Sequence, residues 1–337
     1  MNAILTAVGS LLLVVGHAQS ADAAGPVLGI DGFSFTLNDK PVFLLGASYY
    51  GALGSEREEF IEQDMDDFAA HGFNWVRVWA TWADFDNNVS AVATNGLPRQ
   101  PYMARLERLC ELASVRGIVV DVTVTRGKPP AFPSNFPEHL AVMNCLAKGL
   151  KRFRNVYFDI GNERNVGDER HVPIKEVGDL VRAVKQIDPD RLCTASDGGD
   201  LSKEATIELV EIGGADFICP HRARVEESPM QTAGTTRAYR AWLTEGAKAV
   251  PVHYQEPFRR DYGNWNPTAD DFMTDLENAK DGGAAGWCFH NGANSLTFDK
   301  RPRRSFDMRA AEGRLFDQLD KVEKEFLSHL RAAVAKP

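Results

Sequence analysis

The feature that most constrains the fold of this 337-residue chain is a regular alternation of short apolar runs with longer amphipathic runs. Each short run has the length and β-branched content of a buried strand, and each longer run has the apolar spacing of a helix packed on one face. Strands that alternate with helices pair in parallel through right-handed crossovers. The predicted strands are Val42–Ala47, Asn74–Trp79, Gly117–Thr123, Asn155–Ile160, Leu192–Ala195, Ala215–Cys219, Val250–Tyr254 and Gly283–Phe289.

Eight strand–helix units close a (β/α)8 barrel, which takes roughly 250 residues or more as one domain. Gly72, Gly117 and Gly283 follow predicted helices, as a left-handed helix cap requires. An open doubly wound sheet also alternates, but it usually carries an early glycine-rich phosphate turn, and none occurs here. We therefore predict an α/β fold, a single-domain TIM barrel, with an N-terminal β-hairpin around residues 38–41. The predicted helices are Arg57–His71, Tyr102–Arg116, Glu138–Phe153, Pro173–Ile187, Lys203–Ile212, Thr235–Ala247, Ala269–Lys280 and Met308–Ala333.

The first residues have the pattern of an export signal. A short apolar stretch over residues 3–16 precedes Ala21-Asp22-Ala23, an A-x-A cleavage pattern. The stretch is shorter than the about 20 apolar residues that a membrane span needs. We predict a signal peptide over residues 1–23, a folded domain over 24–337, and a secreted or periplasmic protein. A buried N-terminal helix is the alternative interpretation.

The charged residues argue against a nucleic-acid partner. The formal net charge is −9, and no Lys/Arg-rich run is present. A small substrate that is neutral or tolerates an acidic protein fits this charge better than a polyanion. The five cysteines show no C-x-x-C and no zinc spacing. Cys110 and Cys145 lie on successive predicted helices and could pair if the protein is exported, so their pairing stays open.

Two glutamates follow predicted strands at the point where apolar residues give way to polar ones. Glu163 ends the run that begins at Asn155, and Glu256 ends the run that begins at Val250. The carboxyl ends of the strands carry the active site in a (β/α)8 barrel. Two facing carboxylates are the equipment that hydrolysis of a glycosidic bond requires. The strand-end positions therefore predict a glycosidase, with one carboxyl protonated and the other ionised.

Taken together, the strand ends resemble a retaining glycoside hydrolase of clan A, the group that includes the family 5 cellulases and mannanases. The resemblance runs from near Gly32 to the helix after Phe289. It implies that residues 24–337 form the catalytic domain. Asn162-Glu163 looks like the Asn-Glu pair in which Glu is the acid/base and Asn contacts the sugar 2-hydroxyl. Glu256 looks like the nucleophile of the clan.

The resemblance also implies supporting residues. Arg77 resembles the arginine that holds the nucleophile ionised, and His221 and Trp287 resemble wall and floor residues of the sugar site. The chain departs from many family 5 enzymes at Ala223, where a tyrosine contacts the nucleophile; we expect Tyr254 or Arg222 to substitute, unless the nucleophile is tuned differently. At Thr125 the chain lacks a histidine often found after the third strand.

Aromatic side chains crowd the predicted strand ends, and flat rings with polar edges suit stacking against sugars. We predict that Tyr254, Trp265 and Trp287 bind substrate, and that Trp79 either binds substrate or packs in the core. Asp159 is predicted to be a buried structural carboxylate paired with an arginine, and Asp197 to be a solvated loop residue or part of a subsite. The aromatic set is Tyr49, Tyr50, Trp79, Trp82, Tyr254, Tyr262, Trp265 and Trp287.

These observations predict a retaining β-glycosidase that acts on β-linked glycans, of the β-glucan or β-mannan type, and needs no cofactor or metal. The expected partner is an oligo- or polysaccharide, without nucleic acid or membrane after signal removal, and a monomer is favoured. An exo-acting glycosidase on short oligosaccharides and a catalytically silent carbohydrate-binding barrel are the alternatives. A barrel aldolase or isomerase would need a Schiff-base lysine or a phosphate site at the last two strands, and the sequence offers neither.

Overall fold

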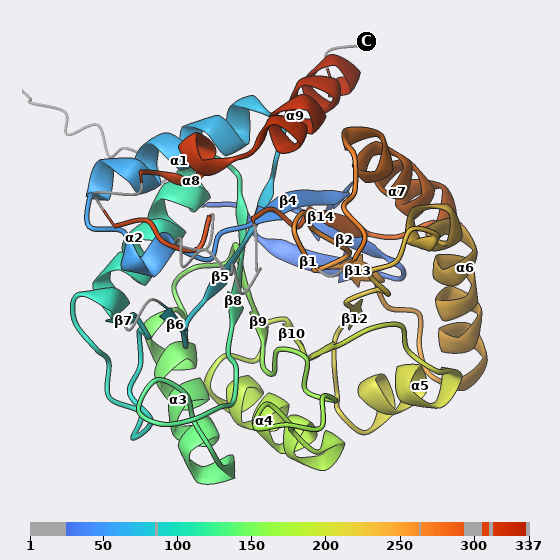
Figure 1. Ribbon diagram of the computed structural model, residues 1–337. Helices are drawn as coiled ribbons and strands as arrows, with labels where there is room; N and C mark the ends of the chain where they lie inside the picture. Colours follow the sequence, from blue (N-terminus) through green and yellow to red (C-terminus); the bar gives the residue numbers. More distant parts are fainter. Residues whose placement is uncertain (1–24, 85–86, 263, 293–304, 310–312, 335–337) are drawn as a thin grey trace, which may run out of the picture.

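A ring of parallel strands occupies the centre of the molecule, and helices surround it (Figure 1). The structure is a computed structural model that describes residues 25–84, 87–262, 264–292, 305–309 and 313–334. The predicted signal peptide lies outside the described residues, so export stays a prediction. The central strands are β4 (Leu44–Ser48), β5 (Trp75–Trp79), β8 (Val119–Thr123), β9 (Val156–Asp159), β10 (Cys193–Thr194), β11 (Ser196–Asp197), β12 (Cys219–Pro220), β13 (His253–Tyr254) and β14 (Gly286–Phe289).

The pairing of these strands closes the ring. Seven of them pair in the order β10-β9-β8-β5-β4-β14-β13. After Ala195, β11 continues from β10 and pairs in parallel with β12. A parallel bridge between Ile218 and Val252 then joins the β12 edge to the β13 edge. The predicted (β/α)8 barrel is confirmed, with the fifth strand divided into β10 and β11.

The helices follow the predicted order with changes at their ends. Gly72, Gly117 and Gly283 adopt the left-handed conformation expected of helix caps, with φ of 79°, 71° and 84°. The helix predicted to begin at Thr235 begins at Ser228 instead, and the last predicted helix is divided into α8 and α9. The helices are α1 (Glu58–Ala70), α2 (Tyr102–Val115), α3 (Phe136–Gly149), α4 (Ile174–Ile187), α5 (Lys203–Glu211), α6 (Ser228–Gly246), α7 (Ala269–Gly282), α8 (Leu315–Gln318), α9 (Lys321–Val334) and the short 3-10 helix η1 (Ala52–Gly54).

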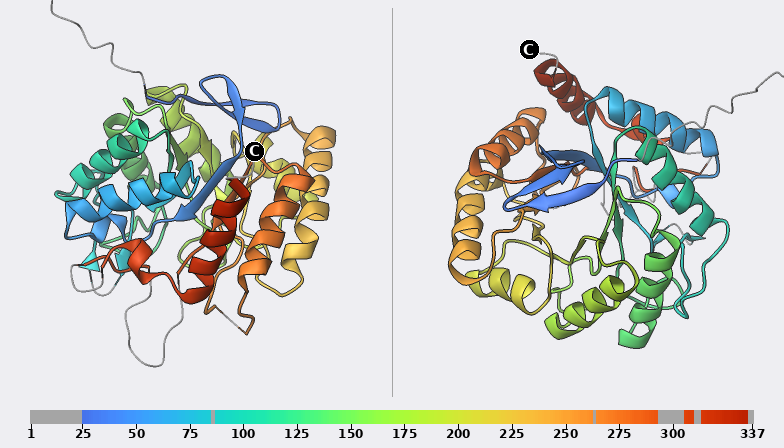
Figure 2. Two further views of the ribbon diagram at one scale, coloured as in Figure 1. Left: turned by 90° about the horizontal axis from the view of Figure 1, so that it is seen from above. Right: turned by 180° about the vertical axis from the view of Figure 1, so that it is seen from behind.

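A small antiparallel sheet covers the amino-terminal end of the barrel (Figure 2). It consists of β1 (Leu28–Asp31), β2 (Ser34–Leu37) and β3 (Lys40–Val42), so the predicted hairpin gains a third strand. Asn38 and Asp39 form the tight turn between β2 and β3 with φ of 51° and 62°, as a type I′ turn requires. A further short pair, β6 (Ala83–Asp84) and β7 (Asn87–Asn88), lies in the connection between β5 and α2.

Alternation along the strands divides the core into two parts. One set of side chains packs between the strands and the helices, and a second set fills the barrel interior. In the interior, Phe35 of β2 lies edge-on to Phe217 and His253, with ring centroids 4.9 and 5.7 Å apart. These rings close the amino-terminal end of the barrel and leave the carboxyl-terminal end for polar groups.

The five cysteines are free thiols, so the structure does not pair Cys110 with Cys145. Burial raises the pKa of the Cys110 thiol to about 12. Among the described residues, no helix is both long and apolar enough to cross a membrane.

The interior packing of Phe35 predicts a large effect of its removal. Its side chain is fully buried, so Phe35→Ala leaves a cavity between the small sheet and the barrel. We expect the free energy of unfolding to fall by roughly 3 to 5 kcal/mol, as for other large-to-small core substitutions. Denaturant titration measures this change. Val115→Ala, at a position 80% exposed, is the control and is expected to change stability by no more than about 0.5 kcal/mol.

Candidate active site

Glu256 lies at the carboxyl-terminal end of the barrel among cationic and polar groups. Its Oε1 accepts hydrogen bonds from Arg77 and, at 3.5 Å, from the Tyr50 hydroxyl. Its Oε2 accepts a 2.9 Å hydrogen bond from Arg224 and lies 3.3 Å from His290 Nε2. Burial disfavours the charged carboxylate, but the surrounding histidine and arginine charges outweigh it and hold the pKa of Glu256 well below its usual range. Glu256 is therefore ionised.

Arg77 connects this carboxylate to the barrel interior. The arginine is fully buried on β5 and donates to Asp159 at 2.7 Å and to Asn162 at 2.8 Å, besides Glu256. Its Nε lies 3.3 Å from a carboxylate oxygen of Asp121. Asp159 is thus the buried structural carboxylate paired with an arginine that the sequence predicted. Side chains of three strands therefore meet at this guanidinium. Burial alone would lower the pKa of Arg77, but the surrounding carboxylates raise it above its ordinary value.

Glu163 stands across from Glu256 in the loop between β9 and α4. Its backbone adopts φ of 47°, a conformation that a non-glycine residue rarely adopts, and its N–H donates to Ser196 Oγ at 3.1 Å. Its carboxylate accepts from Arg170 and lies 3.4 Å from His221 Nδ1 and 3.7 Å from Arg224. Burial raises its pKa, but His221, Arg224 and Arg170 together lower it to about 2.

The expectation of one protonated and one ionised carboxyl is therefore wrong for the free site. The pKa values of both Glu163 and Glu256 are lowered. The physical reason is the number of cations: Arg170 and Arg224 lie against Glu163, and Arg77 and Arg224 lie against Glu256. Only the Arg77 contact could be predicted from the sequence.

The two carboxylates and His221 form a close triangle. One ligand atom from each of Glu163, His221 and Glu256 lies within 4.8 Å of the other two. An oxygen–oxygen separation of no more than 4.8 Å is compatible with the about 5 Å between carboxyl groups in retaining glycosidases, and it is shorter than the gap that inverting enzymes keep for a water molecule. The same three atoms could hold a metal ion. However, the guanidinium groups of Arg77, Arg170 and Arg224 already occupy these carboxylates, and a divalent cation would have to displace them.

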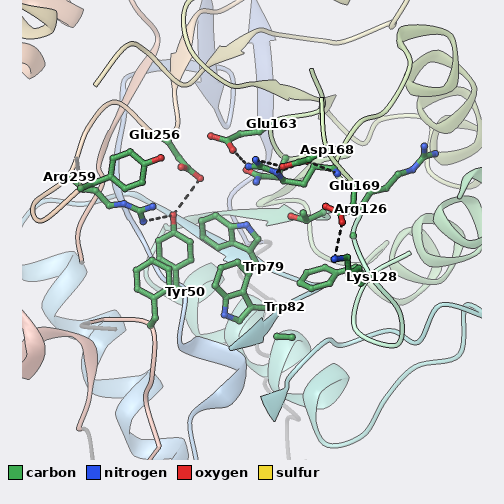
Figure 3. Close-up of a pocket in the computed structure, with 18 of the residues that line it drawn as sticks. Tyr50, Trp79, Trp82, Arg126, Lys128, Glu163, Asp168, Glu169, Glu256 and Arg259 are labelled. Atoms are coloured by element: carbon green, nitrogen blue, oxygen red, sulfur yellow. Dashed lines mark hydrogen bonds and ion pairs between the residues drawn. The ribbon is translucent and has the colours of Figure 1, made fainter. Parts of the chain in front are cut away.

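A pocket of about 470 Å³ opens above the two glutamates, within the size range of small-ligand sites (Figure 3). Tyr50, Trp79 and Trp82 form one wall (Figure 3). Tyr50 is stacked between Trp79 and Phe306, with ring centroids 4.0 Å from each, so its hydroxyl is held beside Glu256. Trp79 both lines the pocket and packs on its neighbours, so it combines the two predicted alternatives.

Tyr254 and Trp287 lie outside the barrel interior, contrary to the prediction that they bind substrate. The Tyr254 hydroxyl is 2.6 Å from Thr236 of α6, and the Trp287 indole donates to Asp275 of α7 at 2.7 Å. Both are fully buried between strands and helices. On β14 the alternation that turns Trp287 outward turns His290, three residues later, toward the site.

Other predicted residues also occupy different surroundings. Trp265 is half-buried against Phe258, with ring centroids 4.8 Å apart, and does not line the pocket. Asp197 is neither solvated nor part of a subsite, because it is buried and paired with Arg164 at 2.9 Å. Arg222, one of the two expected substitutes for a tyrosine at Ala223, pairs with Asp200 instead.

Tyr50 supplies the tyrosine contact to Glu256 that Ala223 cannot make. Tyr50 was predicted as one of the rim aromatics, without this contact to Glu256. Arg170, Arg224, Arg259 and His290 were not predicted as site residues. Arg224, Arg259 and His290 lie within five residues of the ends of β12, β13 and β14, and this position was the available signal, whereas Arg170 lies far along the loop after β9.

The environment of Glu163 predicts a pH-dependent part of the folding stability. Its folded-state pKa of about 2 lies below its ordinary value of 4.5, so the ionised side chain stabilises the folded protein above pH 4.5. This stabilisation, at most about 3 kcal/mol, is lost as the pH falls from 4.5 toward 2. Unfolding free energies measured across this range should fall more steeply with acidification for the wild type than for Glu163→Gln. Equal slopes for the two proteins would contradict the assigned ion pairs.

Comparisons with known proteins agree on the fold. No protein-family model matches the sequence, and no curated protein matches it. Among solved structures, the endo-1,4-beta-mannanase from Rhizomucor miehei is 14% identical with a TM-score of 0.63, covering 92% of this chain and 100% of that one. GH5_18 from Streptomyces cattleya in complex with GlcNAc is 16% identical with a TM-score of 0.63, covering 88% and 81%. The hyperthermostable endo-1,4-beta-D-mannanase from Thermotoga petrophila is 13% identical with a TM-score of 0.61, covering 86% and 99%. The chain thus has the (β/α)8 fold of the family 5, clan A glycoside hydrolases.

Proposed function

We propose that the protein is a retaining β-glycosidase in which Glu256 is the nucleophile and Glu163 the acid/base. The observation that carries this proposal is a pair of carboxylates, with an oxygen of one within 4.8 Å of an oxygen of the other, that line a pocket at the carboxyl-terminal end of the barrel. Carboxylates at this separation support attack by one of them on the sugar rather than by a water molecule held between them. The fold shared with family 5 glycoside hydrolases adds to this support.

In the first step, a carboxylate oxygen of Glu256 attacks the anomeric carbon and the glycosidic C–O bond breaks. The departing oxygen takes the proton of the Glu163 carboxylic acid, which leaves Glu163 ionised. Arg77 and Tyr50 hold Glu256 in position from the side of the barrel interior. The sugar is now joined to Glu256 through an ester bond, with its anomeric configuration inverted.

In the second step, a water molecule replaces the departed group. The Glu163 carboxylate removes a proton from this water, whose oxygen attacks the anomeric carbon, and the ester bond to Glu256 breaks. Glu256 leaves as a carboxylate, and the second inversion restores the original configuration. Asn162, fixed by its hydrogen bond to Arg77, lines the pocket and is proposed to contact the sugar 2-hydroxyl.

Glu163 must gain a proton before the first step. In the free site, Arg170 contributes to keeping it ionised. The Arg170 side chain is 33% exposed and also pairs with Asp168 at 2.7 Å, so it has a second partner close by. A sugar entering the pocket and separating Arg170 from Glu163 would raise the pKa of Glu163, because it removes a cation and excludes water.

The proposed substrate is a β-linked glycan of the β-mannan or β-glucan type. The solved structures of similar fold include endo-1,4-β-mannanases and a GH5_18 protein in complex with Manb1-4GlcNAc, which favours β-mannosides as the first class to test. The chain length of the products distinguishes exo action, which releases short products from one end, from endo action within the glycan.

Hydrolysis of aryl β-glycosides, β-mannan, β-glucan and xylan tests the two glutamates. We expect wild-type activity on at least one substrate, and a loss of several orders of magnitude in both Glu163→Gln and Glu256→Gln, because each removes a group that acts on the reacting atoms. Proton NMR of the first product should show retained anomeric configuration. Glu169→Gln, which alters a lining carboxylate that pairs with Lys128 outside the triangle, is the comparison variant.

Two results would overturn parts of this proposal. Activity that survives both glutamine substitutions would place the chemistry elsewhere in the pocket. A wild type that binds sugars without cleaving any of them would favour the silent carbohydrate-binding barrel.

The ion pair with Arg170 predicts a shift in the pH profile. Arg170→Met removes a cation that lowers the pKa of Glu163, so the pKa rises and the protonated acid persists to higher pH. We expect the high-pH limb of the kcat/KM profile to move upward by about one unit. Arg182→Met, at an exposed arginine of α4, is the control. A limb that stays in place or moves to lower pH would show that Arg170 does not set this protonation.

A further inference from the structure

Cationic side chains are unusually frequent in the pocket for a site that would bind neutral sugars. Four of them have carboxylate partners: Arg126 pairs with Glu176, Lys128 with Glu169, Arg170 with Glu163 and Asp168, and Arg224 with Glu256. The fifth lining cation, Arg259, forms no ion pair with any residue in the part of the chain that the structure describes.

Arg259 is a buried guanidinium with unused donors. Its residue is 5% exposed, and within the described part of the chain it donates one hydrogen bond, to the Tyr50 hydroxyl at 3.3 Å (Figure 3). Its buried Nε has no hydrogen-bond partner among the residues that the structure describes. Burial lowers the pKa of Arg259, and the nearby charge of Glu256 only partly offsets the lost hydration. A buried guanidinium without an ion-pair partner lowers the stability of the protein unless a bound anion pairs with it.

A second arginine lies beside it across one aromatic ring. Arg259 lies 5.1 Å from the centroid of the Tyr262 ring, and Arg224 lies 4.5 Å from the same centroid. Arg224 shares its charge with Glu256 at 2.9 Å and Glu163 at 3.7 Å. The two guanidinium groups thus converge on one side of the pocket, and among the described residues only Arg224 of this pair forms ion pairs with carboxylates.

Resting on the proposed glycosidase function, we infer that the pocket takes a sugar with a negatively charged substituent, a carboxylate or a sulfate ester, which Arg259 binds with help from Arg224. A guanidinium presents parallel N–H groups that match the oxygens of either substituent. The Tyr50 hydroxyl lies 3.3 Å from Arg259 and 3.5 Å from Glu256, so Arg259 is adjacent to the nucleophile. The charged substituent therefore belongs to the ring whose anomeric carbon Glu256 attacks.

Matched pairs of substrates test this inference. We would measure kcat/KM on aryl β-glucosides, β-mannosides and β-galactosides, and on the uronide and the 6-sulfate that correspond to each of them. The proteins compared are the wild type, Arg259→Met and Arg259→Lys. We expect kcat/KM to favour one charged member of a pair over the neutral one. In Arg259→Met this preference should fall roughly 10-fold to 100-fold, the range of a charge-assisted hydrogen bond. Arg259→Lys keeps the charge but loses the paired donors, so its preference should be intermediate.

The ratio of kcat/KM for the charged substrate to kcat/KM for its neutral partner distinguishes a binding role of Arg259 from a structural one. Arg259 also lies over the rings of Tyr50 and Phe306, so a purely structural effect would reduce activity on both members of a pair equally. Arg260→Met is the control, because Arg260 pairs with Asp320 and does not line the pocket. Thermal unfolding of each variant checks that it is folded. Comparing uronide with sulfate identifies the substituent.

Calorimetric titration with glucuronate, glucose 6-sulfate and glucose separates failure of this inference from failure of the proposed function. Binding of an acidic sugar that Arg259→Met loses, without hydrolysis of any glycoside, would uphold the anion site and overturn the glycosidase. The wild type could instead cleave neutral glycosides, with a charged-to-neutral ratio of kcat/KM that Arg259→Met leaves unchanged. That result would uphold the glycosidase and overturn the anion site. A wild type that neither binds nor cleaves any charged sugar would also overturn the anion site.

Discussion

The interaction on which the site depends is the buried contact of Arg77 with three carboxylates. Asp121, Asp159 and Glu256 come from different strands, and each would be costly to bury alone. The guanidinium donates hydrogen bonds to Glu256, Asp159 and Asn162, and its Nε donates to Thr123 while lying 3.3 Å from Asp121. The same cation therefore holds β5, β8, β9 and the loop after β13 in register and keeps the nucleophile ionised. Strand pairing closes the barrel, and the Arg77 contact fixes the geometry of the site at its end.

The parts of the fold and site that could be predicted are those fixed by local pattern. Eight apolar runs with helices between them require parallel pairing, and the polar residue after each run must lie at one edge of the barrel. Glu163 and Glu256 were placed together by this pattern, and Arg77 and Asn162 by the resemblance to clan A hydrolases; all four meet at the site. The added strand β1 pairs with its neighbour β2 across a turn at residues 32–33, and its four residues are too short a run to stand out as a strand. The divided fifth strand depends on the pairing of Ser196 with Cys219, a partner distant in sequence that local pattern does not reveal.

The errors came from side-chain direction and from loops. Tyr254 and Trp287 lie near the correct strand ends, but strand alternation turns both toward the helices, where Thr236 and Asp275 satisfy their polar groups. A difference of one position along a strand decides whether a side chain faces the pocket or the outer core. The fact that a residue is aromatic does not reveal which way it faces. Arg170 occupies a loop without periodicity. Its contact with Glu163 depends on the path of the chain between β9 and α4, so no sequence spacing indicates it.

The overall charge of the protein and the charge of its pocket have opposite implications for the substrate. A net charge of −9 argues against a polyanion, yet the pocket gathers arginines around two ionised glutamates. These facts are compatible if the negative charge on the substrate is a single group at one sugar position, because the pocket then acts over a few ångströms while the surface charge is screened over about 10 Å. An anionic substituent bound by Arg259 and Arg224 would also draw Arg224 away from Glu163. The pKa of Glu163 would then rise toward the protonated form that the first step requires, so binding of the charged group would itself prepare the acid.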